Sequence, residues 1–415
     1  MKTTKSFEIS KYDVVRAWEM VKANQGAAGV DGQTIEQFES DLKGNLYKLW
    51  NRLSSGTYFP PAVKTVAIPK KAGGIRKLGI PTVSDRVAQM VAKLHFEPLV
   101  EPHFHRDSYG YRPTKSAHQA LAITRKRCWH YNWVLEFDIK GLFDNIDHQL
   151  LMKAVNKHTG SRWLRLYIER WLTAPIQVEA GTTVARKRGV PQGGVISPVL
   201  SNLFMHYAFD KWLERHFPDN PFCRYADDGL VHCHSEAQAK TIKAALAIRL
   251  QECGLEMHPD KTKIVYCKDS DRQEEHPVTS FDFLGYTFRP RRSKNRWGKY
   301  FVNFSPAMSA TAGKAIRQAV RRWKLHLRSD KSLLDLARMF KVTIQGWINY
   351  YGRFYKSAMY PTLRHINRKL CLWAMRKYKK LNRHRRRAEY RLGAIANQHP
   401  GMFPHWKLGV KPMVG

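Results

Sequence analysis

Two adjacent aspartates, Asp227 and Asp228, lie in the segment Arg224-Tyr225-Ala226-Asp227-Asp228-Gly229, between two short apolar runs. Apolar runs separated by a few small and polar residues are typical of a β-hairpin, so both carboxylates are expected at its turn. An isolated Asp-Asp pair is usually only a solvated turn, because Asp and Gly favour turns. The significance of this pair therefore depends on what else the chain brings to it.

A third aspartate, Asp138, lies in an alternating segment, where Trp133, Leu135, Phe137 and Ile139 would share one face of a strand and Asp138 the other. Carboxylates brought together need positive charge, because like charges raise one another's pKa. Mg²⁺ prefers a few carboxylates plus phosphate oxygens. Two such ions about 3.5–4 Å apart can hold both the attacking and the leaving oxygen of a phosphoryl transfer. The three aspartates therefore indicate two Mg²⁺ ions and polymerase chemistry.

The charge balance points to a polyanionic partner. The chain has 415 residues with 71 Lys and Arg against 34 Asp and Glu, which gives a net charge of +37. Residues 291–415 hold 30 of the basic residues and only three of the acidic ones. An excess of this size repels itself unless it faces a polyanion. Nucleic acid is preferred over a membrane surface, because the sequence has no apolar run of about 18 residues and no signal-peptide pattern.

The six cysteines form no regular framework and no Cys-x-x-Cys pair, which favours a reducing cytosol over an oxidising compartment. The tripeptide His232-Cys233-His234 is superficially metal-like. Alternate residues of a strand point to opposite faces, however, and no second ligand pair follows, so a zinc site is not expected.

Residues 66–81 are interpreted as two short strands joined by a basic Gly-Gly turn that presents Lys70, Lys71 and Arg76. Such a tip can hold a triphosphate, since Arg makes bidentate contacts to phosphate and Lys acts as a point charge. The alternative is a solvated hairpin whose lysines protect an edge strand. The segment alone does not decide between them.

Two further segments fit a nucleotide site. Residues 144–157 have helical spacing with Asp147 as a plausible N-cap. Residues 189–198 form a Gly/Pro-rich loop before an apolar helix over 199–213, where glycines permit close backbone approach and Gln192 can hydrogen-bond a ligand. Many loops have this composition, so the signal is weak by itself.

Helices are expected to dominate after residue 303. The spacing predicts one helix over 313–328, with an apolar stripe and a parallel basic stripe formed by Arg317, Arg321, Lys324 and Arg328. Like charges at i,i+4 cost roughly 0.2–0.5 kcal/mol per pair in an isolated helix, which favours a phosphate backbone nearby over a solvated face. Helices carrying Leu333 to Tyr351 and Leu363 to Trp373 are expected to form bundle core rather than base-stacking platforms. Dense basic clusters follow at 376–380 and 383–387.

In chain order these segments resemble the sequence blocks of reverse transcriptases, specifically the reverse transcriptase-maturases encoded by bacterial group II introns. Residues 26–32 resemble the extra N-terminal block, 68–81 and 109–118 the fingers blocks, 137–148 the first palm block, 189–198 the nucleotide-site loop and 225–228 the catalytic turn. Residues 254–263 and 283–286 resemble the last two blocks, and 346–351 the maturase thumb signature. A single Asp-Asp is weak support, whereas the seven polymerase blocks from 68–81 to 283–286, in order, are strong.

The resemblance implies an α+β right-hand polymerase with fingers, an antiparallel palm sheet, a helical thumb and a basic C-terminal helical region. It assigns residues 1–60 to an N-terminal extension and the start of the fingers, 61–290 to fingers and palm, 291–359 to the thumb and 360–415 to a DNA-binding-like region. Asp138, Asp227 and Asp228 would hold two Mg²⁺. Lys70 and Arg76 would hold the triphosphate, Phe143 would exclude a ribose 2′-hydroxyl, and Gln192 would contact the incoming nucleotide.

The partners implied are intron RNA, an RNA template, a DNA primer or target and deoxynucleoside triphosphates, in a bacterial cytosol close to the nucleoid. The Arg317 to Arg328 face would contact template and primer. Fuller members of the family carry a nuclease with a cysteine-rich metal site, and no such cysteines follow here, so cleavage of target DNA is not expected. Two alternatives remain: an RNA-binding splicing factor with an idle polymerase site, and a reverse transcriptase of a retron, a diversity-generating element or a phage-defence system.

Overall fold

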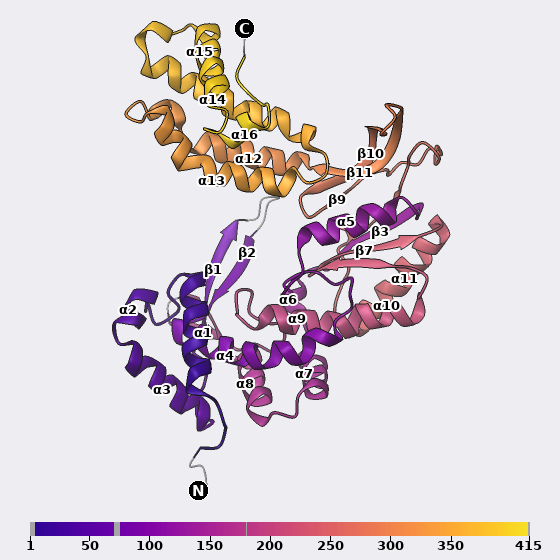
Figure 1. Ribbon diagram of the computed structural model, residues 1–415. Helices are drawn as coiled ribbons and strands as arrows, with labels where there is room; N and C mark the ends of the chain where they lie inside the picture. Colours follow the sequence, from indigo (N-terminus) through magenta and orange to yellow (C-terminus); the bar gives the residue numbers. More distant parts are fainter. Residues whose placement is uncertain (1–4, 70–74, 180, 414–415) are drawn as a thin grey trace. The chain divides into compact units, whose positions relative to one another are not determined.

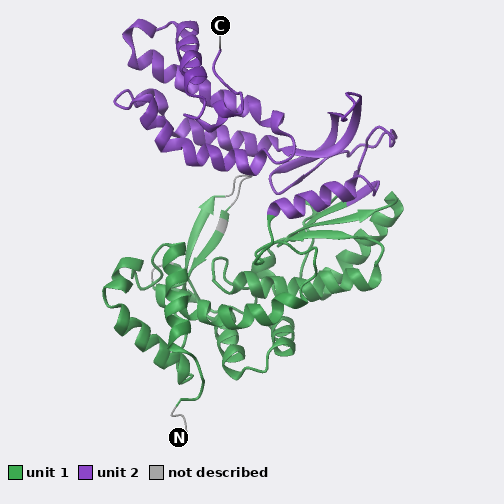
Figure 2. Cartoon of the chain, in the orientation of Figure 1, with its two compact units in different colours: residues 1–116, 135–264 green, residues 117–134, 265–415 purple. Residues whose placement is uncertain are grey.

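The computed structural model describes residues 5–69, 75–179 and 181–413. The chain divides into two compact units, residues 1–116 with 135–264 and residues 117–134 with 265–415 (Figure 2). Packing defines these units, so the boundaries of the four regions expected from the sequence remain predictions.

The first unit begins with helices whose ends are set by side-chain caps. Ser10 caps α1 (Lys11–Asn24), and Thr34 and Gln37 form a reciprocal capping box at α2 (Ile35–Ser40). Both helices, together with α3 (Leu42–Ser54), pack near the buried helix α4 (Val83–Val100) (Figure 1). The one-turn helix η1 (Glu101–His103) follows.

A four-stranded sheet of order β2-β1-β4-β5 follows. Its members are β1 (Val63–Pro69), β2 (Ile75–Ile80), β4 (Ile176–Glu179) and β5 (Thr182–Val184). The pair β1 and β2 is antiparallel, as the hairpin expected over 66–81 requires, and β4 runs parallel to β1. The tip of that hairpin, including Lys70 and Lys71, lies outside the described residues.

The second sheet has the order β6-β7-β3-β8 and carries the aspartates. Its members are β3 (Trp133–Asp138), β6 (Phe222–Tyr225), β7 (Asp228–Cys233) and β8 (Lys263–Tyr266). The remaining elements of this unit are α6 (Leu142–Asn145), α7 (His148–His158), α8 (Arg162–Thr173), α9 (Ser197–Met205), the π-helix η2 (His206–Asp210), α10 (Lys211–His216), α11 (Glu236–Glu252) and η3 (Pro259–Lys261). Asp147 caps α7 through the Leu150 amide, which confirms the predicted cap.

The second unit contains α5 (Ala117–Cys128) and the sheet β11-β10-β9, formed by β9 (Phe281–Phe283), β10 (Tyr286–Lys294) and β11 (Tyr300–Met308). A helical bundle follows, made of α12 (Ala310–Arg322), η4 (Leu325–Leu327), α13 (Leu333–Tyr351), η5 (Lys356–Met359), α14 (Tyr360–Lys377), η6 (Lys379–Leu381), α15 (Arg385–Gln398) and α16 (Pro404–Lys407). Apolar residues of α13 and α14, including Ile344, Leu363 and Trp373, are buried in one core, which confirms the predicted bundle core.

The prediction of a single helix over residues 313–328 is wrong. Helix α12 ends at Arg322, and Lys324 adopts a left-handed backbone (φ 48°). The Trp323 ring stacks on Phe340 at 4.1 Å and on Trp347 at 5.5 Å, so packing against α13 holds the chain at this break. Periodicity alone does not reveal such a break, because tertiary packing of one large ring overrides a weak local propensity.

Among the described residues, no helix combines the length and the apolar character that a bilayer crossing requires.

Candidate active site

The Asp-Asp pair lies at the tight turn between β6 and β7, where Tyr225 pairs directly with Asp228. Ala226 and Asp227 form the two-residue connection, and Ala226 has a positive φ of 58°. A residue with a Cβ is uncommon in this region and persists only where its surroundings hold it. The sequence therefore sets the hairpin, and neighbouring residues fix its turn.

Sheet order brings Asp138 to the pair. Strand β3 is the hydrogen-bonded neighbour of β7, Asp138 is its last residue, and its carbonyl accepts from the His258 amide at 2.8 Å. The side chains of Asp138 and Asp228 are hydrogen-bonded to each other. The structure thus places together the aspartates that the sequence singled out.

Burial raises the pKa of Asp228 to about 7, and the negative charges of Asp227 and Asp138 add to the shift. The ammonium of Lys261 opposes it. Lys261 donates to Asp138 Oδ2 at 2.8 Å, and this hydrogen bond raises the lysine's own pKa. Sequence reasoning placed Lys261 in a family block without a role, because its 123-residue separation from Asp138 hides the contact.

The donor set suits Mg²⁺, since carboxylate oxygens are its preferred protein ligands. Within the described part of the chain, however, no three acidic, histidine or cysteine side chains are arranged around one metal position. The carboxylates instead satisfy one another through the Asp138–Asp228 hydrogen bond and through Lys261. A metal ion would require ionised Asp228 and would take over the charge that Lys261 now supplies.

A buried ionic network holds the turn from behind. Arg224 is fully buried and makes a bidentate pair with Asp210, with both contacts at 2.7 Å. Its third nitrogen, Nη1, donates to the Ala226 carbonyl and to Asn202 Oδ1, both at 3.1 Å. Burial alone would raise the pKa of Asp210, but the charge and hydrogen bonds of Arg224 more than offset it and lower the pKa. Arg224 therefore ties the strained residue of the turn to the π-helix.

Gly110 completes this support. A Cβ at this position would lie 2.5 Å from the Ala226 amide nitrogen, so only glycine allows the two backbones to approach. The Gly110 carbonyl accepts from the Asn202 side chain at 2.7 Å, and the Tyr109 amide donates to the Arg224 carbonyl at 2.8 Å. The Tyr109-Gly110 segment thus acts on the aspartate turn through its backbone.

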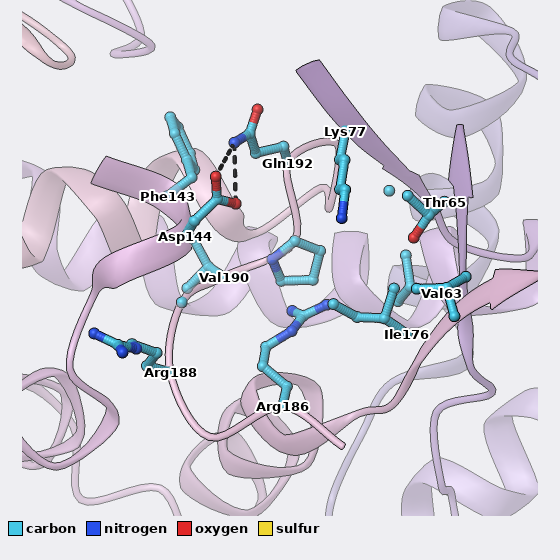
Figure 3. A pocket seen from close by; sticks show the side chains of 14 residues that line it. Val63, Thr65, Lys77, Phe143, Asp144, Ile176, Arg186, Arg188, Val190 and Gln192 are labelled. Atoms are coloured by element: carbon cyan, nitrogen blue, oxygen red, sulfur yellow. Dashed lines mark hydrogen bonds between the residues drawn. The ribbon is translucent and has the colours of Figure 1, made fainter. Parts of the chain in front are cut away.

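A cavity of about 180 Å³ in the same unit is lined by Phe143, Gln192 and residues of β1, β2 and β4 (Figure 3). The loop before α9 docks there, because the Val190 amide donates to the Phe143 carbonyl and the Gly79 amide to the Gln192 carbonyl, each at 2.7 Å. Two of the predicted nucleotide-binding residues, Phe143 and Gln192, therefore line one cavity. Lys70 lies outside the described residues, and of Arg76 only the backbone, in β2, is described.

Two polar residues that line this cavity, Asp144 and Arg186, were not predicted from the sequence. The Gln192 amide donates to both carboxylate oxygens of Asp144, at 3.1 and 3.0 Å (Figure 3). Burial lowers the pKa of Arg186 to about 10, although Asp144 acts in the opposite direction. Its Nη1 is buried without a hydrogen-bond partner within the described ranges. A buried, unsatisfied guanidinium nitrogen is costly, which makes Arg186 a candidate for an anionic or carbonyl ligand.

The four basic residues predicted to contact nucleic acid do not share one helix face. Arg317 and Arg321 are on α12, and Arg317 donates to Thr362 at 3.2 Å. Arg328 lies beyond the break and donates to the Trp323 carbonyl at 2.9 Å, where it caps the helix end. Their role in binding nucleic acid stays a prediction, now without the support of a shared stripe.

Residues 68–288 match the family model for reverse transcriptase (RNA-dependent DNA polymerase), and residues 313–391 match that for the group II intron maturase-specific domain. The chain is 31% identical to protein YkfC of Escherichia coli over 342 residues, covering 73% of this chain and 86% of YkfC. It is 34% identical to the group II intron-encoded protein LtrA of Lactococcus lactis over 193 residues, 46% of this chain and 32% of LtrA.

A putative COX1/OXI3 intron 1 protein of Saccharomyces cerevisiae is 26% identical over 60% of this chain and 29% of its own length. The chain thus spans about a third of LtrA and of this yeast protein. Among solved structures, telomerase from Candida albicans aligns with a TM-score of 0.46 and 16% identity, covering 90% of this chain and 67% of that one.

Proposed function

We propose that this chain, which belongs to the reverse transcriptases encoded by group II introns, copies RNA into DNA at the site formed by Asp138, Asp227 and Asp228. The observation that carries this proposal is the convergence of three carboxylates from β3 and from the β6–β7 turn, with the pKa of Asp228 raised to about 7. Clustered acids held this way are typical of sites that work with a bound cation.

The three aspartates would hold two Mg²⁺, which would neutralise charge on the attacking and leaving oxygens of nucleotidyl transfer. Asp228 would give up its proton and Lys261 would leave Asp138 as the site loads. The Arg224 network and Gly110 hold the turn in one position, so little reorganisation of the backbone is needed. Catalysis of this kind depends on positioning and on charge stabilisation more than on covalent chemistry.

The cavity beside Phe143 and Gln192 would receive the incoming deoxynucleotide. The Gln192 amide, which now donates to Asp144, would instead donate its hydrogen bonds to the substrate. The unsatisfied Nη1 of Arg186 would gain an acceptor. The Phe143 ring, which lines the cavity, would exclude a ribose 2′-hydroxyl. Lys70 and Arg76 would bind the triphosphate from the β1–β2 hairpin.

Primer extension on an RNA template with a DNA primer and deoxynucleotides tests the polymerase proposal. Asp227→Ala is expected to abolish incorporation, whereas Asp219→Ala, which removes an exposed carboxylate of the same unit, is expected to leave it unchanged. Phe143→Ala is expected to raise ribonucleotide incorporation relative to deoxynucleotide incorporation. Undiminished extension by Asp227→Ala would refute the assignment of the site.

We further propose that the chain binds its parent intron RNA and assists splicing, on the ground that residues 313–391 match a maturase-specific domain. Residues 291–415 contain 30 basic residues, which can contact phosphates, and only three acidic ones. Neutralising Arg321 and Lys324 is expected to weaken RNA binding and to reduce the salt slope by about 0.7–0.9 for each phosphate that is no longer neutralised. Splicing assistance by wild-type protein that extends no primer in any metal would instead favour a splicing factor with an idle polymerase site.

A further inference from the structure

The outer part of the β10–β11 hairpin is a two-stranded ribbon with an unusual surface. β9 pairs only with Tyr286 to Phe288, whereas β10 and β11 remain paired as far as Lys294 and Tyr300 (Figure 1). Between Arg289 and Lys299 the sequence has six basic residues and no acidic one. This ribbon belongs entirely to the second unit, and neither the aspartate site nor the predicted basic residues of 317–328 include it.

The tip of the ribbon is a turn held by hydrogen bonds of Asn295. Asn295 Oδ1 accepts from the amides of Trp297 and Lys299 at 3.0 and 2.9 Å, and the Asn295 amide donates to the Lys299 carbonyl at 2.9 Å. Gly298 supplies the positive φ of 87° that closes it. The indole of Trp297 is nevertheless 74% exposed. An ordered turn therefore presents a large aromatic ring to solvent.

Cations stack on the exposed rings. The guanidinium of Arg296 lies 4.1 Å from the Trp297 ring centre, and that of Arg292 lies 4.0 Å from the ring centre of Tyr300, which is 55% exposed. Lys294 pairs across the strands with Tyr300, so Arg292, Lys294 and Tyr300 share one face of the ribbon. Rings and positive charges thus alternate over a short distance.

Two alternative explanations, protection of a strand edge and structural arginines, do not account for the exposed rings and cations together. Basic residues on a strand edge prevent pairing with other strands, but that purpose requires no exposed tryptophan. A structural arginine is at least partly buried and hydrogen-bonded, as Arg291 is through the Ser305 and Thr287 carbonyls, each at 3.0 Å. Arg292, Lys294 and Arg296 are instead exposed. A protein partner would meet the five exposed cations of this segment, which contains no acidic residue, so a polyanion is the better complement.

We propose that the outer hairpin, residues 289–301, binds an unpaired segment of RNA, with bases stacked on Trp297 and Tyr300 and phosphates beside Arg292, Lys294 and Arg296. Bases in a duplex do not expose their faces, whereas loops of a folded RNA do, and proteins read such loops by stacking them on aromatic and arginine planes. This inference rests on the proposed binding of intron RNA and assigns part of that binding to the hairpin.

Photo-crosslinking tests the site directly. The full chain is irradiated with a single-stranded thiouridine oligomer of about 15 nucleotides, with a DNA oligomer carrying thiothymidine, and with a fully paired RNA of equal length. Crosslinked peptides are then identified by mass spectrometry. Crosslinks at residues 292–301 with single-stranded RNA, and few with the duplex, support the proposal. Their absence with RNA, or their restriction to DNA, overturns it.

Variants measure the contribution of the rings. Trp297→Ala and Tyr300→Ala are each expected to weaken oligouridine binding at least about five-fold, and Trp297→Phe and Tyr300→Phe to retain most of it. Lys240→Ala, which truncates an exposed side chain of α11 in the other unit, serves as the control for loss of a surface side chain. Unchanged binding in the Ala variants overturns the proposal, and an unchanged melting temperature establishes that the variants fold.

Primer extension on a short unstructured template separates this inference from the proposed function. Extension by Trp297→Ala at the wild-type rate, together with weakened oligouridine binding, is the expected result. Wild-type protein that extends primers but forms no hairpin crosslink would refute the hairpin site alone. Failure of wild-type extension would refute the polymerase assignment, whatever the crosslinks show.

Discussion

Replacement of Asp210 by Asn is expected to destabilise the protein far more than the loss of an ordinary ion pair. Asp210 and Arg224 are both fully buried and joined by two hydrogen bonds of 2.7 Å. Asn keeps the shape but leaves the guanidinium without a counter-charge. Removing one partner of a buried pair costs about 3–5 kcal/mol. A domain is typically stable by only about 5–15 kcal/mol, so this loss is a large fraction of the total.

Denaturant unfolding at neutral pH measures the effect, and Lys211→Met is the matched control. Lys211 pairs with Glu214 at 2.9 Å in the same unit, but both side chains are about half exposed, so its removal is expected to cost no more than about 1 kcal/mol. Because the folded-state pKa of Asp210 is lowered, the stabilisation is present above the ordinary aspartate pKa of about 3.9 and is lost as the pH falls through the folded value.

The double variant Arg224→Met with Asp210→Leu separates stability from positioning. Apolar replacement of a whole buried pair is often neutral, so the double variant is expected to be more stable than Asp210→Asn. It removes the donor to the Ala226 carbonyl, however, and primer extension is expected to stay low. A cost for Asp210→Asn as small as that of Lys211→Met, or full polymerase activity in the double variant, would refute this reasoning.

Three further predictions concern the aspartate site. Since the pKa of Asp228 is about 7, the affinity for Mg²⁺, measured by thermal shift, should fall up to about ten-fold per pH unit below that value and level off above it. Without metal, the raised pKa of Asp228 should make the free energy of unfolding fall as the pH rises from about 4 to 7. An affinity independent of pH would contradict a proton on this carboxyl. Lys261→Met should tighten Mg²⁺ binding, because the Lys261 ammonium competes with the metal for Asp138. The ammonium is 58% exposed, so its contribution is about 1 kcal/mol, which corresponds to about five-fold in affinity. Weaker binding would show that Lys261 does not compete with the metal. Gly229→Ala should destabilise by about 1–3 kcal/mol and reduce primer extension, because its Cβ would lie 2.1 Å from the Phe137 ring, whereas Gly160→Ala, which meets nothing within 4 Å, should be neutral in both assays.

Much of the fold was predictable from local patterns. The hairpin at residues 225–228, the strand that contains Asp138 and the capped helix α7 all follow from period and capping chemistry. The family match over residues 68–288 confirms the predicted right-hand polymerase class. These features depend on residues close together in sequence, where periodicity is informative.

The errors and omissions share one cause, which is long-range packing. The break after Arg322 comes from Trp323 stacking on α13. The contacts of Lys261 with Asp138 and of Gln192 with Asp144 span 123 and 48 residues. Nothing in the local sequence around Arg186 indicates that its guanidinium is buried beside a cavity.

By itself the sequence determined which residue types carry the chemistry and which strands and turns present them, because hydrophobic period, turn residues and charge balance act locally. Tertiary structure alone decided which carboxylates touch, which cation neutralises them and which buried arginine holds the strained turn. A pKa of about 7 for Asp228 does not follow from its sequence neighbours alone. It arises when burial and the distant Asp138 add their effects to the charge of the adjacent Asp227.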